Sequence, residues 1–518
     1  MNIVFTTQTV GLKVFYHLLC RIKEPLGVDK VGFYVAHSMY YDKFAKEHPE
    51  IESDNAVVKE WEIVAKARKL KPNLDKIRAY EKSVGNPTLW EPIICDRRVY
   101  LGKHCKERQD YHPSFTHEQM LSILQLALEK LEQLIDEVKP DIVLSLDPVT
   151  FGDYTLYLLC KAKNIPMLFF RTTKIRNYIE FSSTMSGCSP HIYRFFQEYE
   201  KGGLTDKWTD EAKAYLESSR EAHIRYEGMI LAPSKRGEVQ SKSNVVGSII
   251  RDLIDEVKYL VKYRKDHHIP GRITPFVYRK FISPFKAKLR NWQYSRYYVS
   301  DSQLSSMDFA FYPLQSEPEI SSLIWGKSYM NHIETIRNIA RSLPVGMKLL
   351  VKEHPRSLGY RASGYYRKLL EIPNVVLSHP ERDVRSLIKK SKIVVCIATF
   401  VAFEAVIYKR PAIMLGGPRS FCILPDSMIR YVHSPNDLAV EIADLIKNYE
   451  YKEKPLINYI AATMRGAVPI DYFTAVLKKK QRYGDTGVDK FDEEIEKMAD
   501  YTINRINSFF HDIKESSV

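Results

Sequence analysis

The chain has 518 residues, 45% hydrophobic and 27% charged, which excludes a wholly disordered protein. A single hydrophobic core rarely grows past about 250–300 residues, so two or three domains are expected. The formal net charge of +14 favours an anionic partner: nucleic acid, acidic lipid, or a phosphorylated or acidic substrate.

The seven cysteines are scattered and form no C-x-x-C pair. This pattern is not typical of a disulfide framework or a zinc site, and it favours a reducing, cytoplasmic location. The N-terminal segment predicts a strand, a loop and a helix, and not a signal peptide. No run of about 18 apolar residues is present, so no membrane-spanning segment is predicted.

The first half alternates short apolar strands with amphipathic helices, beginning with a strand at Ile3–Phe5. Thr116 and Gln119 form a T-x-x-Q capping box, and the apolar periodicity that follows predicts a helix to Val138. A strand, a loop, a helix and a strand are then expected at 141–146, 147–153, 154–163 and 167–170. This β-α-β order predicts a parallel sheet, in a Rossmann-like N-terminal domain that spans 1–240.

Residues 258–298 differ in composition, with eleven Lys or Arg and one acidic residue, Asp266, among ten aromatic residues. We interpret 241–304 as an interdomain segment with a basic face. Such a face suits an anionic membrane surface, an acidic glycan or nucleic acid. The simpler alternative is a solvated linker.

A second α/β block follows. Its five expected strands are 309–314, 348–354, 373–378, 392–398 and 411–417. Helices are expected at 328–342 and 384–390. This pattern predicts an open parallel sheet of Rossmann type in a C-terminal domain at 305–480, followed by a helical tail at 481–518. The predicted fold class is therefore α/β, with two Rossmann-type parallel-sheet domains.

In open α/β sheets, ligands bind at the carboxyl ends of the strands. The residues at the ends of the second block's strands include Gln315, Glu317, Glu319, Lys352, His354, Pro355 and Thr399. A His and a Lys there suit a phosphate group. Glu404, about one helical turn past Thr399, is placed to accept hydrogen bonds from ribose hydroxyls. The alternative for Lys352 to Pro355 is a solvated strand end that proline terminates. Glu353 alternates to the opposite face of its strand and is expected to be structural.

Three stretches resemble the capsule polysaccharide biosynthesis family: FYPLQSEPE (311–319), KLLVKEHPRSLGYR (348–361) and FEAVIYKRPAIMLGG (403–417). The resemblance covers about residues 305–420, and the first half is similar mainly in the arrangement of its elements. One departure lies at 398–401, where the family usually has Gly-Thr-x-Gly and this chain has Ala-Thr-Phe-Val. Without those glycines the backbone approaches a phosphate less closely.

The resemblance implies a glycosyltransferase of GT-B fold, with two domains facing a central cleft and the nucleotide-sugar donor on the C-terminal one. Lys352, His354 and Pro355 would meet the donor phosphate, and Gln315, Glu317 and Glu319 would shape the donor pocket. Thr399 and Glu404 would hold phosphate and ribose. The His-Pro pair favours a CMP-sugar, and a UDP-sugar is the alternative.

The same resemblance implies no cofactor and no metal, and no D-x-D sequence occurs in the chain. The implied acceptor is a surface or capsular polysaccharide or its lipid-linked primer, and nucleic acid is not expected. The expected location is cytoplasmic, with a peripheral position at the inner membrane face, through residues 258–298, as a further hypothesis.

Transfer to an acceptor hydroxyl needs a general base. Asp147 and Asp153, in the loop after a predicted strand, are the candidates. Each has a simpler alternative, because Asp147 suits a turn and Asp153 suits a helix N-cap. Arg171, at the end of the next strand, is a candidate for binding an acidic acceptor, with a surface salt bridge as the alternative.

Three other functions stay open at this point. A teichoic-acid-type polyol-phosphate transferase and a sugar-nucleotide epimerase share the expected fold. A non-catalytic protein that binds an anionic polymer would share the positive charge without the reaction.

Overall fold

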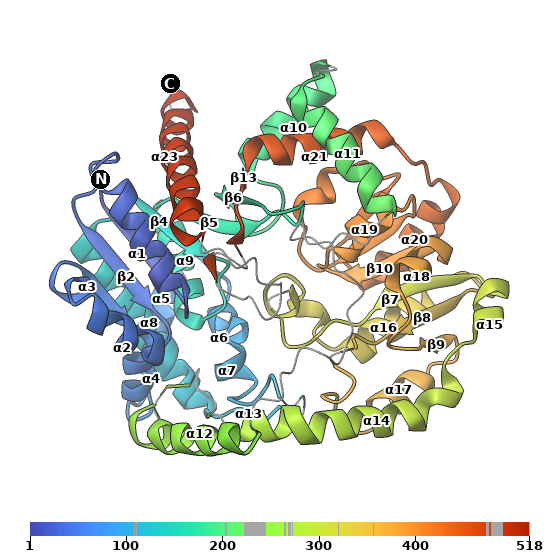
Figure 1. Ribbon diagram of the computed structural model, residues 1–518, viewed down its shortest axis with the longest axis horizontal. Coiled ribbons are helices and arrows are strands. Elements are labelled where there is room, and N and C mark those ends of the chain that lie inside the picture. The colour runs from blue at the N-terminus through green and yellow to red at the C-terminus, as the bar shows by residue number, and fades with distance from the viewer. Residues whose placement is uncertain are drawn as a thin grey trace.

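The computed structural model contains two α/β sheets, one on each side of the molecule (Figure 1). It describes residues 1–107, 109, 111–202, 205–221, 245–263, 266–267, 271, 273–319, 321–355, 357–472, 476–477 and 490–516. The seven strands of the N-terminal sheet lie in the order β13 (Val468–Pro469), β6 (Tyr178–Ser182), β5 (Met167–Thr172), β4 (Ile142–Leu146), β1 (Ile3–Thr7), β2 (Val31–Val35) and β3 (Ala56–Lys59). From β5 to β3 all pairs are parallel, whereas β6 pairs antiparallel with both β5 and β13.

Helices cover both faces of this sheet, because alternate strand residues point to opposite sides. One face buries Phe5 and Phe33 together with α1 (Gly11–Ile22). The other face buries Val4 and Val143 together with α8 (His117–Val138) and α9 (Phe151–Ala162). The shorter helices of this half are α2 (Ser38–Glu47), α3 (Glu50–Ser53), α4 (Glu60–Ala67), α5 (Leu74–Val84), α6 (Trp90–Cys95) and α7 (Arg97–Tyr100).

The C-terminal sheet has six strands, and all of its pairs are parallel. Their order is β12 (Ile429–Val432), β11 (Ala412–Leu415), β10 (Ile393–Ile397), β7 (Phe309–Pro313), β8 (Lys348–Lys352) and β9 (Val375–Ser378). One face packs on α16 (His332–Arg341), α17 (Tyr365–Leu370) and α20 (Leu438–Lys447). The other face packs on α18 (Val384–Lys390), α19 (Val401–Ile407) and α21 (Glu453–Gly466). Single turns complete this half: η4 (Ser321–Trp325), η5 (Lys327–Tyr329), η6 (Ser420–Ile423) and η7 (Pro435–Asp437).

Two Rossmann-type, mostly parallel sheets, each covered by helices, confirm the predicted fold class. The predicted helix after Thr116 is present as α8, with both hydrogen bonds of the capping box. The helix expected at 328–342 begins later, at His332, because the 3-10 turn η5 precedes it. Among the residues that the structure describes, no helix is long and apolar enough to cross a membrane.

A succession of helices connects the two halves, and most of it runs along the lower edge of the molecule in Figure 1; we call it the connecting rod. It consists of α12 (Val245–Lys258), η1 (Tyr259–Tyr263), α13 (Ile273–Val277), η2 (Tyr278–Ile282), α14 (Ser283–Tyr294), η3 (Ser295–Tyr297) and α15 (Asp301–Ser306). Three basic residues counted in the sequence, Arg264, Lys265 and Arg272, lie outside the described residues.

The structure moves two predicted domain boundaries. Residues 468–469 form β13 in the N-terminal sheet, and α23 (Phe491–Ser516) buries Ile495 and Met498 in the same core as α1. The described residues after 467 therefore belong with the N-terminal half, and not with a C-terminal domain and a separate tail. Conversely, α10 (Pro190–Gly202) and α11 (Lys207–Glu221), predicted within the N-terminal domain, pack on α21 and share the core of the C-terminal sheet.

Candidate functional site

Loops that follow strands of the C-terminal sheet contact the N-terminal half directly. Gln109 Nε2 donates to the Glu317 carbonyl at 2.9 Å, and Trp325 Nε1 donates to the Met185 carbonyl at 3.3 Å. The backbone N–H of Gly187 donates to the Pro418 carbonyl at 2.9 Å. The carboxyl ends of these strands, where open α/β sheets bind ligands, thus lie at the boundary between the two halves.

Asp147, at the carboxyl end of β4, is half-buried at this boundary. Its Oδ1 atom is buried and accepts no hydrogen bond within the described part of the chain. Burial raises the pKa of the Asp147 carboxyl, and the positive charges of Arg171, Arg419 and Lys174 oppose that rise. A carboxylate with an unused oxygen and a raised pKa is suited to accept a proton.

Arg419 brings a positive charge to Asp147 from the other sheet. It follows β11, and its guanidinium lies over the Trp325 ring, 4.0 Å from the ring centroid. Burial lowers the pKa of Arg419, and the negative charge of Asp147 raises it. Sequence reasoning missed this residue, although it comes directly after the Gly-Gly-Pro that ends β11 and so could have been placed at the strand end.

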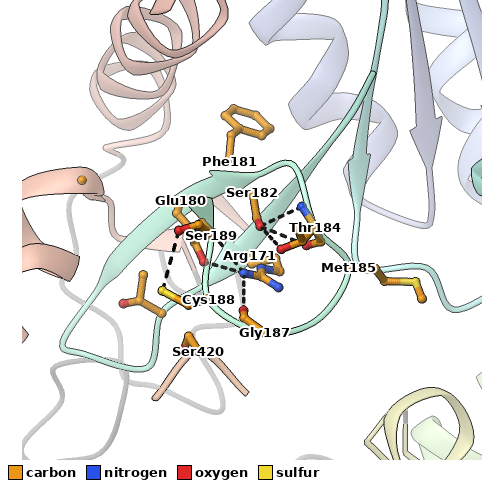
Figure 2. A network of polar contacts seen from close by, with 12 residues as sticks. Arg171, Glu180, Phe181, Ser182, Thr184, Met185, Gly187, Cys188, Ser189 and Ser420 are labelled. Carbon is orange, nitrogen blue, oxygen red and sulfur yellow. Dashed lines mark hydrogen bonds and ion pairs between the residues drawn. The ribbon is translucent and has the colours of Figure 1, made fainter. Parts of the chain in front are cut away.

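Arg171 lies in a buried network and not at the surface (Figure 2). Its Nη2 atom is 2.9 Å from Glu180 Oε1, and it also donates to the Gly187 carbonyl and to Ser189 Oγ, at 3.2 Å each. Ser189 Oγ in turn donates to the second oxygen of Glu180. The network fixes the loop after β6, which pairs with Arg419 through Gly187. Arg171 therefore positions this loop. The salt bridge considered as the alternative to acceptor binding is present, but it is buried and not at the surface.

Asp153 is fully buried at the start of α9. Thr150 is the N-cap residue, and Asp153 completes the capping box as the third residue of the helix. The Asp153 carboxylate also accepts a hydrogen bond from Gln8 Nε2. Burial raises the pKa of Asp153 to about 7. The N-cap position suggested for Asp153 is wrong, because the helix begins earlier and Thr150 is its N-cap. The buried place of Asp153 inside the N-terminal half nevertheless favours a structural role.

Gln315 and Thr399, two of the predicted donor residues, lie at the ends of the neighbouring strands β7 and β10. Gln315 Nε2 donates to the Ile397 carbonyl, which holds the side chain across the two strand ends. Gln315 Oε1, Thr399 Oγ1 and the nearby Ser321 Oγ are buried and lack a hydrogen-bond partner among the described residues. Buried polar atoms are rarely left unpaired, so these three acceptors favour a polar ligand at this edge.

Glu317 and Glu353 share one buried partner, Arg361, whose side chain is 1% exposed. Arg361 Nε lies 2.7 Å from Glu353 Oε2, and Nη1 contacts Glu317. Tyr366 donates to Glu353 at 2.7 Å, and His332 lies 3.1 Å from Glu317. Burial alone raises the pKa of Glu317, but His332 and Arg361 outweigh it and hold that pKa below its usual value. The structural role predicted for Glu353 is confirmed.

The residues at the end of β8 split between the interior and the surface. Lys352 is buried, and its Nζ donates to the Pro380 carbonyl at 2.7 Å. His354 and Pro355 are half-buried, and the His354 backbone N–H donates to Glu353 at 2.8 Å. Glu319 is exposed. Lys352 thus connects β8 to the loop after β9. His354, unlike Lys352, is partly exposed.

Glu404 lies on the side of α19 that faces α18 and α11. Its electrostatic neighbours there are Arg385 and Asp383, and its charge also raises the pKa of Tyr215. Burial raises the pKa of Glu404 itself to about 7. The described neighbours of Glu404 therefore lie on α18 and α11. Gln315 and Thr399, two other predicted donor residues, lie instead at the strand ends.

One group among the described residues has the composition and spacing of a metal site: Glu60, Asp96 and His267. His267 Nε2 lies 3.2 Å from each of the two carboxylates. Burial alone lowers the pKa of His267, but Asp96 and Glu60 outweigh it and raise that pKa to about 10. A protonated His267 makes this group a buried ion triad inside the N-terminal half.

The described geometry defines an α/β protein in two halves, in which loops at the carboxyl ends of the C-terminal strands contact the N-terminal half. Residues 224–421 match the family model described as capsule polysaccharide biosynthesis protein. The resemblance predicted from the sequence is thereby confirmed over these residues. No curated protein matches the chain.

Solved structures that match include a UDP-GlcNAc 2-epimerase from Neisseria meningitidis bound to UDP-GlcNAc. It is 13% identical, with 89% of this chain and 97% of that chain covered and a TM-score of 0.27. The β-Kdo 2,4 transferase of Thermosulfurimonas dismutans KpsC is 12% identical, with 62% and 79% covered and a TM-score of 0.34. The KpsC β-Kdo 2,7 transferase is 9% identical, with 69% and 85% covered and a TM-score of 0.31. Likenesses this distant carry no argument about the reaction.

Proposed function

We propose that the protein is a glycosyltransferase of capsule polysaccharide synthesis. It moves a sugar from a nucleotide-activated donor to a surface polysaccharide or to its lipid-linked primer. The observation that carries this proposal is that Asp147, from the N-terminal half, and Arg419, from the C-terminal half, lie close enough for the charge of each to shift the pKa of the other. A proton acceptor and a positive charge thus come near each other from opposite sheets, as a two-substrate transfer requires.

In the proposed reaction an acceptor hydroxyl attacks the anomeric carbon of the donor sugar. A bond forms between that oxygen and the anomeric carbon, and the bond from the anomeric carbon to the phosphate oxygen breaks. The hydroxyl proton passes to the Asp147 carboxylate, and the nucleotide leaves with its negative charge. Arg419 and Lys174 supply positive charge that stabilises the departing phosphate.

On the donor side, we propose that Gln315 and Thr399 contact the nucleotide through their unpaired oxygens. His354 and Pro355, at the end of β8, complete the phosphate side of the pocket, and this pair is why a CMP-sugar is favoured over a UDP-sugar. The proposed roles of Lys352 and Glu317 are indirect, because both side chains are bound to other protein groups. They would fix the position of the loops that form the pocket and would not contact the donor.

The proposed reaction needs no cofactor and no metal ion, because the positive charge at the phosphate comes from side chains. Turnover that stops when EDTA is added and returns with a divalent cation would contradict this point. We propose that the protein acts at the cytoplasmic face of the inner membrane, where a lipid-linked acceptor is accessible. Nucleic acid is not a proposed partner.

The first experiment measures the thermal stability of the purified protein with CMP, UDP and CDP. Stabilisation by CMP above the other two supports the favoured donor, and no shift with any nucleotide contradicts the donor site. Thr399→Val, which removes one unpaired oxygen at nearly constant volume, should reduce the shift. Thr335→Val, which removes a hydroxyl already bonded to the Asn331 and Tyr329 carbonyls, is the matched control and should leave the shift in place.

The second experiment follows product formation. Transfer from a CMP- or UDP-sugar to capsular polysaccharide supports the proposal. Turnover of CDP-glycerol would instead identify a polyol-phosphate transferase, and conversion of a UDP-sugar without any acceptor would identify an epimerase. Polyanion binding that falls steeply with salt, with no nucleotide bound, would identify a non-catalytic binding protein.

A further inference from the structure

The connecting rod carries a row of exposed apolar side chains along α13, η2 and α14. They are Val277, Phe281, Ile282, Phe285, Leu289 and Trp292, and they are 39–76% exposed. Steps of mostly three or four residues place them on one side of the helix. We call this row the α14 apolar face. A soluble protein rarely leaves several large apolar residues exposed together unless they have a partner.

The opposite side of the same helices is fixed against the C-terminal half. Tyr278 and Tyr294 are buried, and Arg290 Nη1 donates to the Leu358 carbonyl at 2.8 Å. Gly359 lies so close to α14 that a Cβ atom there would come within 2.3 Å of the Ser283 carbonyl. Because these contacts fix the rotation of the helix, the apolar face stays turned outward.

The charge along this part of the rod is of one sign. Residues 273–300 contain six basic residues and no acidic residue. They are Arg279, Lys280, Lys286, Lys288, Arg290 and Arg296. A second copy of the chain would bring the same charges to the face and be repelled. Exposed aromatic side chains beside Lys and Arg, without acidic residues, are instead typical of helices that lie in the interface of an anionic bilayer.

The apolar surface extends to the other end of the rod. On α12 and η1, the side chains of Ile250, Leu253, Ile254, Val257, Leu260 and Val261 are 48–78% exposed and share one side of the helix. This end is attached to the N-terminal half, where Tyr263 and Lys262 contact Asp42, at 3.2 and 2.7 Å. One rod, whose helices run below both halves in the view of Figure 1, therefore carries exposed apolar residues at both of its ends.

We propose that the connecting rod is a membrane-binding surface for anionic phospholipid. The α14 apolar face enters the boundary between headgroups and acyl chains. The exposed basic side chains beside it contact the lipid phosphates; they are Arg279, Lys280, Lys288 and Arg296. The apolar residues of α12 add contact area at the other end. This attachment would hold both halves at one distance from the bilayer. It does not depend on which sugar is transferred.

The test uses the full chain and vesicles of phosphatidylcholine, with and without phosphatidylglycerol, in a sedimentation assay. The triple variant Phe281→Ser, Phe285→Ser, Trp292→Ser removes the aromatic residues of the face. The control Val345→Ser, Val440→Ser removes two apolar side chains that are 107% and 71% exposed elsewhere. We expect the wild type and the control to bind the anionic vesicles, and binding to weaken with salt. We expect the triple variant to bind at least about tenfold more weakly.

Three outcomes would overturn the proposal: no binding of the wild type to anionic vesicles, equal binding of the triple variant and the control, or a dimer in light scattering that the triple variant abolishes. Salt-dependent RNA binding that the triple variant loses, without vesicle binding, would also overturn it and assign the face to nucleic acid. Because the three residues are exposed, the triple variant should keep the wild-type unfolding temperature. An unchanged nucleotide-induced shift in that variant separates loss of membrane binding from failure of the proposed transferase.

Discussion

The proton affinity of Asp147 results from two opposing effects on one side chain. Burial raises the pKa of its carboxyl, and three cationic neighbours act in the opposite direction, with burial prevailing. The same cations would lose part of their influence when a nucleotide phosphate occupies them, so a bound donor should raise the pKa of Asp147 further. The base would then be stronger in the complex than in the free protein.

The first prediction concerns Asp147→Asn, which keeps the shape of the side chain and removes the base. We expect kcat to fall by about 10²–10⁴-fold with the nucleotide affinity preserved. In the wild type, kcat/KM should rise with pH through a pKa above the usual value of about 4, because the base must be ionised to act. Initial rates across pH measure both effects. A variant that keeps its turnover and the same pH profile would exclude Asp147 as the base.

The second prediction concerns the buried partner of Glu317 and Glu353. Arg361→Met leaves both carboxylates in the interior without their cation, so we expect a loss of about 3–5 kcal/mol in unfolding free energy. Arg367→Met is the matched control on α17, since the Arg367 side chain is 74% exposed and lies 3.7 Å from Glu371. We expect the control to change stability by less than about 1 kcal/mol. Equal urea midpoints for the two variants would contradict the assignment of a buried network.

The role of a single residue can be predicted from the sequence when that role depends on residues close to it in the chain. Alternation along β8 is enough to turn Glu353 away from the ligand edge. Glu317 is different, because its partner Arg361 lies 44 positions further along the chain and no local pattern joins them. Arg419 was missed for a similar reason, since its significance depends on Asp147 in the other half.

At the scale of elements, the connecting rod is attached to the N-terminal half by His267, which lies between η1 and α13. Its ring lies between Glu60, the first residue of α4, and Asp96, the N-cap of α7, and all three side chains are buried. One histidine thus joins the rod to two helices.

The third prediction uses the pKa of His267, which is raised to about 10 from an unfolded value of about 6.5. A raised folded pKa means that the stabilisation is fully present below pH 6.5 and is lost as the pH rises toward 10. Urea unfolding across this range should show wild-type stability falling by a few kcal/mol, at about 1.4 kcal/mol per pKa unit. His267→Gln should be less stable at pH 7, by about 3–5 kcal/mol, and should lack this part of the pH dependence. An unchanged slope in the variant would refute the ion triad.

Elements with complete local signals were predicted well, and those that depend on tertiary pairing were not. The capping box at Thr116 and the apolar periodicity that follows it define α8 without reference to the rest of the chain. By contrast, β13 has two residues, which is too short a strand pattern to recognise. The five-residue strand β6 pairs antiparallel with both β5 and β13, and its own sequence does not show those partners. The basic and aromatic composition of the rod was recognised from the sequence. Which of its apolar side chains are exposed could not be predicted, because that depends on how the rod packs against the two halves.

At the scale of the whole molecule, the chain crosses between the halves more than once. It leaves the N-terminal sheet, forms the C-terminal one, and returns through β13 and α23. The amphipathic pattern of the last helix predicts that one face is buried, but it does not say against which domain. For this reason residues 481–518 were predicted from the sequence to form a separate helical tail.

The last prediction tests this return of the chain. Met498 is fully buried against the core that α1 and the N-terminal sheet share, so Met498→Ala should lower the unfolding free energy by about 2–5 kcal/mol. Asp500→Ala, two positions further on an exposed side of α23, should change it by no more than about 0.5 kcal/mol. Because α23 belongs with the N-terminal half, hydrogen exchange in Met498→Ala should accelerate at the amides of β1 and β2 and stay slow in β7 and β10. Acceleration confined to the C-terminal sheet would contradict the placement of α23.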